Sequence, residues 1–305
     1  MTVSWRQRGG VRRRHEPMKR CLACEHLFDA AGWRCPNCGR APEPGRFPSF
    51  LSEDSSVDYV VEAYDDEQWL AFEAANAFWF RPRARLIGNL IHAHFGAPGS
   101  FLEVGCGAGG VMEALSARFP EMRIVGGEPA GGGLAIAARR VPQAELLLVD
   151  ALSLPFRAEF DVVGAFDVLE HLEDDRGAIS EIAAATRPGG LVIISVPQHP
   201  RLWSRYDEAG GHHRRYTRRD LLTKLEAGGL RVECATSFVM SLLPGVAWSR
   251  YRANRARDYD VVAFDSRPKP GSRLLEWVLE REVALIARGV SLPVGSSLVV
   301  AARRV

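Results

Sequence analysis

The segment Phe101–Gly110 constrains the fold of this chain more than any other part of the sequence. It reads FLEVGCGAGG, so a short apolar run leads into four glycines within six positions. The residues that follow, VMEALSARF, carry apolar side chains at helical spacing. Glycines in such a turn allow positive φ angles and a close approach of the backbone to a ligand. The segment therefore predicts a strand, a ligand-binding turn and a helix in succession.

Strand and helix patterns alternate in the segments that follow. We expect strands at MRIVGGEP, AELLLVDA, FDVVGAFDVLEHL and LVIISVP, and helices at LAIAARRV and at DDRGAISEIAAATRPGG, the latter ending at Gly189 and Gly190. The strands are apolar on both sides, which is typical of a parallel sheet with helices on both faces. Ligands of such sheets bind at the carboxyl ends of the strands, near the switch in strand order. The sequence thus predicts an α/β fold with a binding site at the glycine turn.

Three successive strands carry an acidic residue at their carboxyl ends, namely Glu103, Glu128 and Asp150. A carboxylate after the second strand can accept hydrogen bonds from both hydroxyls of a ribose. The G-x-G-x-x-G spacing also fits a dinucleotide fingerprint, so an NAD-dependent oxidoreductase stays open as an alternative. A pyrophosphate would be repelled by Glu103, however, whereas a ligand with an ammonium group would be attracted. The acids therefore favour S-adenosylmethionine as the cofactor.

The chain resembles the class I S-adenosylmethionine-dependent methyltransferases of the small-molecule type. The resemblance covers about residues 80–240 and is carried by LEVGCGAGG, IVGGEPA, LLLVDALSLPF, FDVVGAFDVLEHL and RPGGLVIISVP. It implies a Rossmann-like, doubly wound, mostly parallel sheet of seven strands. RVECATSFV would be the sixth strand, and SSLVVAARRV would be the antiparallel last strand.

The resemblance also implies roles for particular residues. Glu103 would fix the methionine amino group of the cofactor, Glu128 would hold the ribose and Asp150 would contact the adenine. The other cofactor-binding residues that it implies are Gly105, Gly107, Gly109, Ala151, Leu152, Asp167 and Val168. One departure from the family pattern is that Pro129 follows Glu128 and that three glycines, Gly131–Gly133, come soon after. This departure predicts a looser loop before the second helix.

Four of the six cysteines lie within eighteen residues near the N-terminus. Cys21, Cys24, Cys35 and Cys38 form two Cys-x-x-Cys pairs, which can point four thiolates at one tetrahedral zinc ion. A segment this short cannot bury a core, so the metal would supply its folding energy. The pattern resembles a zinc ribbon and predicts a structural zinc site, with disulfides or an iron–sulfur cluster as the alternatives.

Changes in composition divide the chain into segments. Residues 1–20 are rich in arginine and predict a disordered basic tail, and residues 21–48 hold the ribbon-like module. Residues 49–305 would form the methyltransferase domain. Within it we expect a helical lead-in over 58–97, interrupted at Pro82, and an insertion over 240–295 on the substrate side.

The acceptor side of the site is less well specified by the sequence. The candidate catalytic bases are His171, His212 and His213, because histidine is the usual general base. The arginines beside the last two, which could bind an anionic substrate, are Arg214, Arg215, Arg218 and Arg219. The insertion could cover the acceptor, form a dimer contact or lie on a membrane surface.

Together these features predict a methyltransferase that acts on an oxygen or nitrogen atom, with carbon less favoured, of a small-molecule or lipid-linked acceptor. We expect a cytoplasmic protein, since we find neither a long apolar run nor the apolar core of a signal peptide. The basic tail and the ribbon keep a nucleic-acid-binding methyltransferase-like protein open as a further alternative. No base-methylation motif of the Asn-Pro-Pro-Tyr type supports it. The acceptor, the methylated atom and the oligomeric state are not specified by the sequence.

Overall fold

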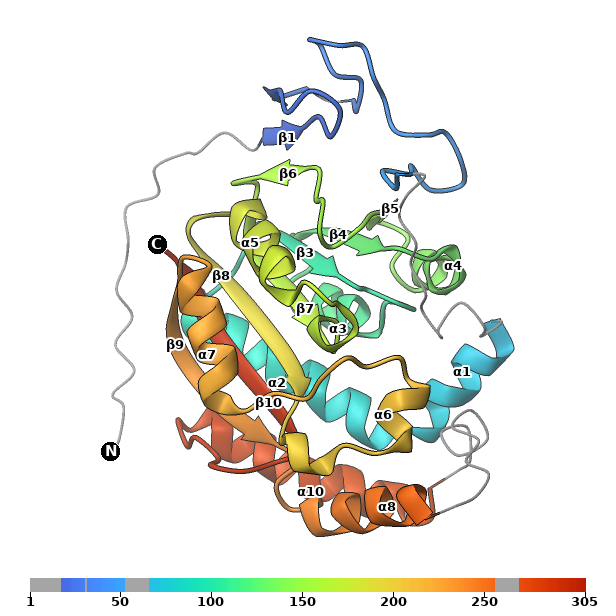
Figure 1. The fold of residues 1–305 in the computed structure, drawn as a ribbon, viewed down its shortest axis with the longest axis vertical. Coiled ribbons are helices and arrows are strands. Elements are labelled where there is room, and N and C mark those ends of the chain that lie inside the picture. Colours follow the sequence, from blue (N-terminus) through green and yellow to red (C-terminus); the bar gives the residue numbers. More distant parts are fainter. Residues whose placement is uncertain (1–17, 31, 53–65, 256–268) are drawn as a thin grey trace.

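A seven-stranded sheet forms the centre of the computed structural model, which describes residues 18–30, 32–52, 66–255 and 269–305. The strand order is β5-β4-β3-β7-β8-β10-β9 (Figure 1). The strands are β3 (Ser100–Val104), β4 (Arg123–Glu128), β5 (Glu145–Leu148), β7 (Phe160–Phe166), β8 (Thr186–Pro197), β9 (Leu230–Phe238) and β10 (Ser297–Arg304). Strand β10 pairs antiparallel with both β8 and β9, and the other neighbouring strands of the sheet pair in parallel. The predicted doubly wound sheet with an antiparallel last strand is therefore confirmed.

Helices cover both faces of this sheet. The longer ones are α1 (Asp66–Ala75), α2 (Ala77–His94), α3 (Gly110–Arg118), α4 (Gly131–Arg140), α5 (Asp175–Ala185), α7 (Arg218–Ala227), α8 (Leu243–Arg255) and α10 (Ser272–Ala287). The short ones are α6 (Arg205–Ala209) and the 3-10 helices η2 (Leu169–His171) and η3 (Pro200–Leu202). In Figure 1, α5 and α7 lie in front of the sheet and α2 lies behind it.

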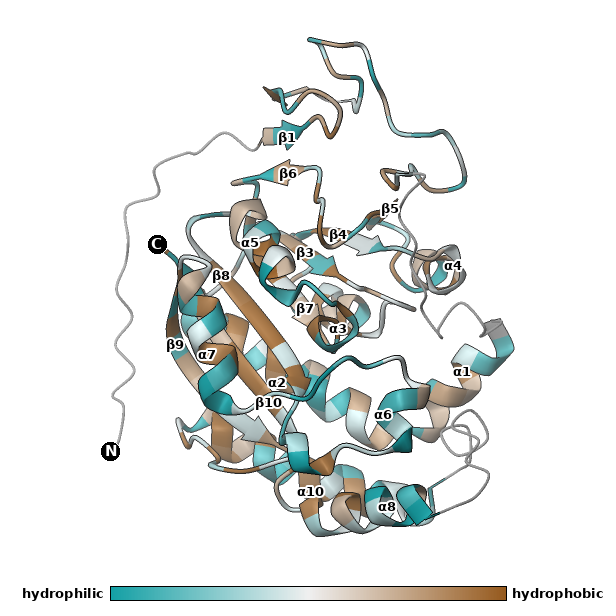
Figure 2. Ribbon diagram, in the orientation of Figure 1, coloured by the Kyte–Doolittle hydropathy of each residue, from teal (hydrophilic) through white to brown (hydrophobic). Residues whose placement is uncertain are grey.

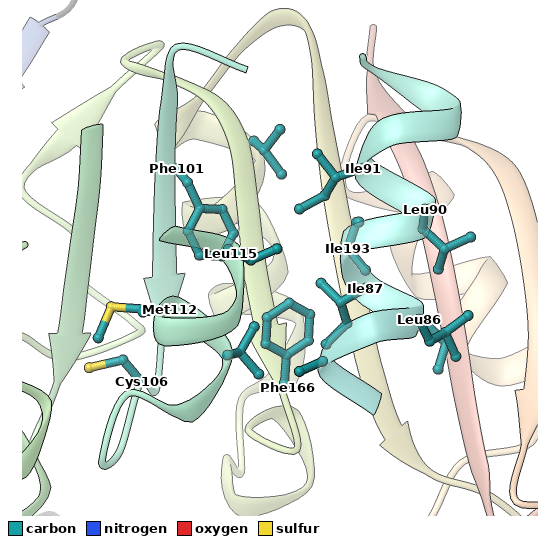
Figure 3. Close-up of a cluster of buried hydrophobic side chains, with 14 of the residues drawn as sticks. Leu86, Ile87, Leu90, Ile91, Phe101, Cys106, Met112, Leu115, Phe166 and Ile193 are labelled. Atoms are coloured by element: carbon teal, nitrogen blue, oxygen red, sulfur yellow. The ribbon is translucent and has the colours of Figure 1, made fainter. Parts of the chain in front are cut away.

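The core has two layers because neighbouring strand residues point to opposite faces. Phe101 packs on the side of α2, α3 and α10, whereas Leu102 packs on the side of α5 and α7. Figure 3 shows the first layer, in which Ile87 and Ile91 of α2 approach the strands. The apolar colouring of β8 and β10 in Figure 2 reflects their burial between the two layers.

Two predicted element boundaries are wrong, and both have local causes. The helix expected to reach Gly189 and Gly190 ends at Ala185, since Pro188 disfavours the helical conformation at the residue before it and supplies no backbone donor. The strand expected to run through the DVLEHL segment ends at Phe166. Asp167 then takes a φ of 57°, which breaks the strand and starts the turn into η2.

Two expectations about loops and breaks also differ from the structure. The glycines at 131–133 do not form a loose loop, because α4 begins at Gly131. A Cβ at Gly133 would lie 2.7 Å from the backbone carbon of Gly107, so the lack of a side chain permits close packing there. The helical lead-in continues through Pro82 and is broken earlier, at Asn76, between α1 and α2.

The N-terminal module contacts the larger domain through backbone pairing. Strands β1 (Met18–Arg20) and β2 (Leu27–Phe28) join β6 (Phe156–Arg157) in a three-stranded sheet, seen at the top of Figure 1. Trp33 packs edge-on against Phe156 and donates from Nε1 to Glu145 at 3.1 Å. Strand β1 falls within the predicted basic tail, and residues 1–17 of that tail lie outside the described residues.

Candidate cofactor and acceptor site

A cavity of about 1610 Å³ opens at the carboxyl ends of β3, β4 and β7. The strand order reverses between β3 and β7, so the cavity lies at the switch point where ligands of such sheets bind. Helices α1 and α2, the turn before α3, and the segments around η2, α6 and α8 complete its wall.

The glycine turn between β3 and α3 has the conformation that its sequence predicts. Gly105, Gly107 and Gly109 have φ angles of 73°, 49° and 79°, which side chains disfavour. The N–H of Gly107 donates to Glu128 Oε2 at 2.8 Å, which ties the turn to the end of β4. A side chain at Gly105 would overlap Val168. The turn therefore presents bare backbone to the cavity.

Most of the predicted cofactor residues line this cavity. They are Glu103, Gly105, Gly107, Glu128, Ala151, Asp167 and Val168. The other three do not line it: Gly109 packs against Met112 and Ala137, Asp150 accepts from the N–H of Leu152 at 2.8 Å, and Leu152 is exposed.

Glu103 is the most unusual of these residues because it is 3% exposed. Burial raises its pKa to about 8, and the nearby Glu128 adds to this, although the positive charge of Arg83 opposes it. Burial also raises the pKa of Glu128 to about 7, although hydrogen bonds from the N–H groups of Gly107 and Ala130 lower it in part. Glu103 Oε2 has no hydrogen-bond partner among the described residues. Such an oxygen fits a ligand that brings a charged donor, such as an ammonium group.

Arg83 is a cavity residue that the sequence analysis missed. It is 7% exposed, forms an ion pair with Asp167, and stacks over Trp79 at 4.3 Å. Burial raises the pKa of Asp167, and Arg83 opposes this shift. An arginine within the apolar run FWFRPRARL was the available signal, because a buried arginine requires a partner.

On the acceptor side, two of the three candidate histidines, His171 and His212, are in contact. The rings of His171 and His212 lie 4.7 Å apart in an edge-to-face arrangement, and both line the cavity. Burial lowers the pKa of His171 to about 3, to which the nearby His212 adds. His213 is exposed and does not line the cavity, although its backbone N–H donates to the Glu170 carbonyl at 2.7 Å.

Asp207, which the sequence analysis did not single out, holds His212 in place. Its carboxylate is fully buried and lies 3.1 Å from His212 Nδ1, and it accepts from Arg215 Nε at 2.7 Å and from Ser204. Burial would raise the pKa of Asp207, but the hydrogen bond with His212 and the charges of Arg215 and Arg250 lower it to about 2. The capping-box pattern Ser204-x-x-Asp207 was the only sequence signal.

The arginines proposed to bind an anionic substrate have other partners. Arg214 contacts Asp175 at 3.2 Å, Arg215 contacts Asp207, and Arg218 donates to the Ala235 carbonyl at 2.7 Å. Among these three and Arg219, only Arg215 lines the cavity.

Two clusters among the described residues present ligand atoms within 4.8 Å of one another, as a metal site requires. One consists of the four predicted cysteines, Cys21, Cys24, Cys35 and Cys38, and the other of Glu170, His171 and His212. In the first cluster the Sγ atoms of Cys21 and Cys38 lie 3.6 Å apart, and those of Cys24 and Cys35 lie 3.7 Å apart. A tetrahedral zinc site with Zn–S bonds of about 2.3 Å has S–S edges of roughly 3.8 Å, so these distances fit a zinc-ribbon-like module.

Comparison with known proteins agrees with this geometry. A methyltransferase domain family matches residues 73–235, which is more than half of the chain. A trans-aconitate 2-methyltransferase from Methylobacterium nodulans is 32% identical over 136 residues, covering 45% of this chain and 50% of that protein. Another, from Azoarcus sp., is 25% identical over 222 residues, covering 72% of this chain and 79% of that protein. The chain thus spans about half the length of the first relative.

A solved structure shares the fold. The phosphoethanolamine N-methyltransferase 2 of Haemonchus contortus, in complex with S-adenosyl-L-methionine, superposes with a TM-score of 0.50 at 18% identity. The match covers 76% of this chain and 56% of that one. The expected resemblance to the S-adenosylmethionine-dependent methyltransferases is confirmed by the family match. The chain belongs to this methyltransferase domain family.

Proposed function

We propose that this protein transfers the methyl group of S-adenosylmethionine to an oxygen or nitrogen atom of a small acceptor bound in the cavity. The observation that carries the proposal is the unpaired, buried Oε2 of Glu103 beside a glycine turn of bare backbone. When bound, S-adenosylmethionine supplies an electrophilic methyl group on a sulfonium. The ammonium group of this cofactor favours the ionised form of Glu103, whereas the negatively charged pyrophosphate of NAD would disfavour it.

The cofactor is held by the residues that line the strand ends. Glu103 binds the methionine amino group, Glu128 holds the ribose, and the turn at Gly105 and Gly107 lies against the methionine end. Ala151 lies beside the adenine. Asp150 is 2.8 Å from the Leu152 amide and does not line the cavity, so we assign it to shaping this loop.

His212 is the group best placed to act as the general base. Its Nδ1 atom is held by the buried, ionised Asp207, which leaves Nε2 to take a proton from an acceptor hydroxyl. His171 packs against its ring and fixes its orientation. His213 receives no role in the reaction, since its side chain is exposed and outside the cavity.

Zinc is proposed for the four-cysteine cluster because the sulfur atoms lie at tetrahedral spacing with no other ligand position open. The role is structural, as none of these cysteines lines the cavity.

The outer surface of the predicted insertion supports contact with a membrane surface and a lipid-linked acceptor. Trp248 and Tyr251 of α8 and Leu274 and Trp277 of α10 are exposed. Arginines stack on two of these rings, Arg255 on Tyr251 and Arg281 on Trp277, a combination that suits anionic lipid headgroups. No helix among the described residues is long and apolar enough to cross a bilayer. Sedimentation with anionic vesicles tests this part, and equal recovery with neutral vesicles would contradict it.

Calorimetry on the purified full chain tests the main proposal. We expect micromolar binding of S-adenosylmethionine and no binding of NAD. Gly107→Arg would fill the turn and abolish cofactor binding, whereas Gly189→Arg, at an open position with a similar φ far from the cavity, serves as the matched control. Binding of NAD alone would contradict the assignment of the site.

A further inference from the structure

Arg250 differs from the other arginines of the cavity wall. The others each have an acidic or amide partner, in the pairs Arg81–Glu276, Arg83–Asp167, Arg85–Glu280, Arg118–Asn89, Arg140–Glu73 and Arg215–Asp207. Arg250 has no carboxylate within 4.0 Å in the part of the chain that the structure describes, and its Nε is shielded from solvent without a hydrogen-bond partner there. The positive charge of the Arg250 guanidinium is therefore not paired with an acidic side chain of the described residues.

The guanidinium of Arg250 is nevertheless held in a defined position. Its central carbon lies 3.6 Å from the ring centroid of Tyr206 on α6, which also lines the cavity. One turn further along α8, Asn254 accepts from the N–H of Arg205 at 3.0 Å and donates to the Trp203 carbonyl at 3.2 Å. These bonds join α8 to the segment around α6. The guanidinium is planar, and stacking on a ring fixes the orientation of that plane, which favours bidentate binding of an anion.

Asp207 does not pair with this charge. It lies close enough for Arg250 to influence its titration, but its oxygens already meet Arg215, His212 and Ser204. The donors of Arg250 are therefore not taken up by this carboxylate.

We propose that Arg250 binds an anionic group of the methyl acceptor, either a carboxylate or a phosphate. This inference rests on the proposed function and specifies the acceptor class for the same cavity. The cavity lining also includes the apolar side chains of Val239, Leu242 and Val246, the last of which lies one helical turn before Arg250 on α8. An acceptor with a charged end at Arg250 and an apolar body along these side chains fits this arrangement.

The test is a calorimetric titration of the full chain loaded with S-adenosylhomocysteine. The probes are trans-aconitate, inorganic pyrophosphate and the neutral trimethyl ester of trans-aconitate, which separate carboxylate, phosphate and charge-independent binding. The variant is Arg250→Gln. The matched control is Arg252→Gln, which removes an exposed arginine of the same helix that does not line the cavity.

We expect the wild type and Arg252→Gln to bind at least one of the two anions and to bind the ester at least tenfold more weakly. Arg250→Gln should lose roughly 10- to 100-fold in affinity for that anion, because a charge-assisted pair contributes about 1.5–3 kcal/mol. Arg250→Lys should retain part of the affinity, since it keeps the charge but not the planar pair of donors. All variants should bind S-adenosylhomocysteine as the wild type does, which shows that they are folded.

Three results would overturn the inference while leaving the proposed function intact. They are normal anion affinity in Arg250→Gln, equal binding of the ester and the anion, and no binding of either anion by the loaded wild type at millimolar concentration. Failure of the wild type to bind S-adenosylhomocysteine would instead contradict the proposed function and, with it, the inference about Arg250.

Discussion

At the scale of single residues, Glu103 gives the most direct prediction about the cofactor. Burial holds its pKa at about 8, so at pH 7 the carboxyl group of the free protein is mostly protonated. An ammonium group favours the ionised form, and cofactor binding at pH 7 should therefore release a proton. Calorimetry at pH 7 in two buffers of different ionisation enthalpy should give different apparent heats for the wild type.

Glu103→Gln should reduce this buffer dependence, leaving only the part that Glu128 contributes, and should bind S-adenosylmethionine about 10- to 100-fold more weakly, as expected for a lost charge-assisted hydrogen bond. The exposed Glu121→Gln should behave as the wild type does. An undiminished buffer dependence in Glu103→Gln would show that another group releases the proton.

His212 and Asp207 form the second prediction at this scale. His212→Asn should lower kcat by about 10²- to 10⁴-fold for a hydroxyl acceptor, the usual contribution of a general base, without changing cofactor affinity. Asp207→Asn should also lower kcat, because it removes the charge that orients the imidazole. His213→Asn, in the next residue, should leave kcat unchanged. A similar loss of kcat in His213→Asn would contradict the assignment of the base.

The sequence could predict only part of this site. Glu103 and Glu128 lie at the carboxyl ends of strands and Gly105 directly follows one, so a local pattern reveals them. Arg250, by contrast, contacts Tyr206, which is distant in the sequence, and nothing local marks its position. Arg83 has local aromatic neighbours, but its acidic partner Asp167 is distant in the sequence. Whether an arginine has a partner is settled only by the fold.

At the scale of elements, the contact between the glycine turn and the start of α4 predicts a sharp contrast between two glycines. A Cβ at Gly133 would meet the backbone of Gly107 at 2.7–2.8 Å, and backbone cannot move aside as a flexible side chain can. Gly133→Ala should therefore lower the free energy of unfolding by about 1–3 kcal/mol and weaken cofactor binding. Thermal melts with and without S-adenosylmethionine measure both effects.

The control for this prediction is Gly131→Ala in the same helix. A Cβ at Gly131 meets nothing within 4 Å, and alanine favours the helix, so stability should stay unchanged or rise slightly. Equal destabilisation by the two substitutions would mean that helix propensity, and not the packing on the turn, determines the effect.

The same pair of glycines shows why element boundaries were harder to predict than element types. Three glycines indicate a weak helix by propensity, but tertiary packing of Gly133 overrides it. Likewise, the strand ends at Phe166 where Asp167 takes a positive φ, and the side chain of Asp167 pairs with the distant Arg83. The alternation of strands and helices was predictable because the strands are short apolar runs and the helices between them carry apolar residues at helical spacing.

At the scale of the whole molecule, the ribbon-like module could be predicted from its cysteines, but its docking could not. Its partner strand β6 has only two residues and therefore shows no periodicity. The module also has its own small apolar cluster of Cys21, Phe28 and Cys35, separate from the two layers around the large sheet. Zinc and the cofactor should therefore stabilise different parts of the chain.

The double variant Cys21→Ser/Cys35→Ser tests this independence. It should bind no zinc, because two thiolates of the tetrahedral set are lost. It should retain S-adenosylmethionine binding, since the module contributes no residue to the cavity wall. It should melt at a lower temperature, because without zinc the contacts of Trp33 with Phe156 and of β1 with β6 are lost. Cys234→Ser, on β9 outside the module, should keep both zinc and the melting temperature within a few degrees. Elemental analysis measures the zinc content, calorimetry measures S-adenosylmethionine binding, and thermal melts measure the melting temperature. Global unfolding of the double variant would show that the larger domain depends on the module for its own stability.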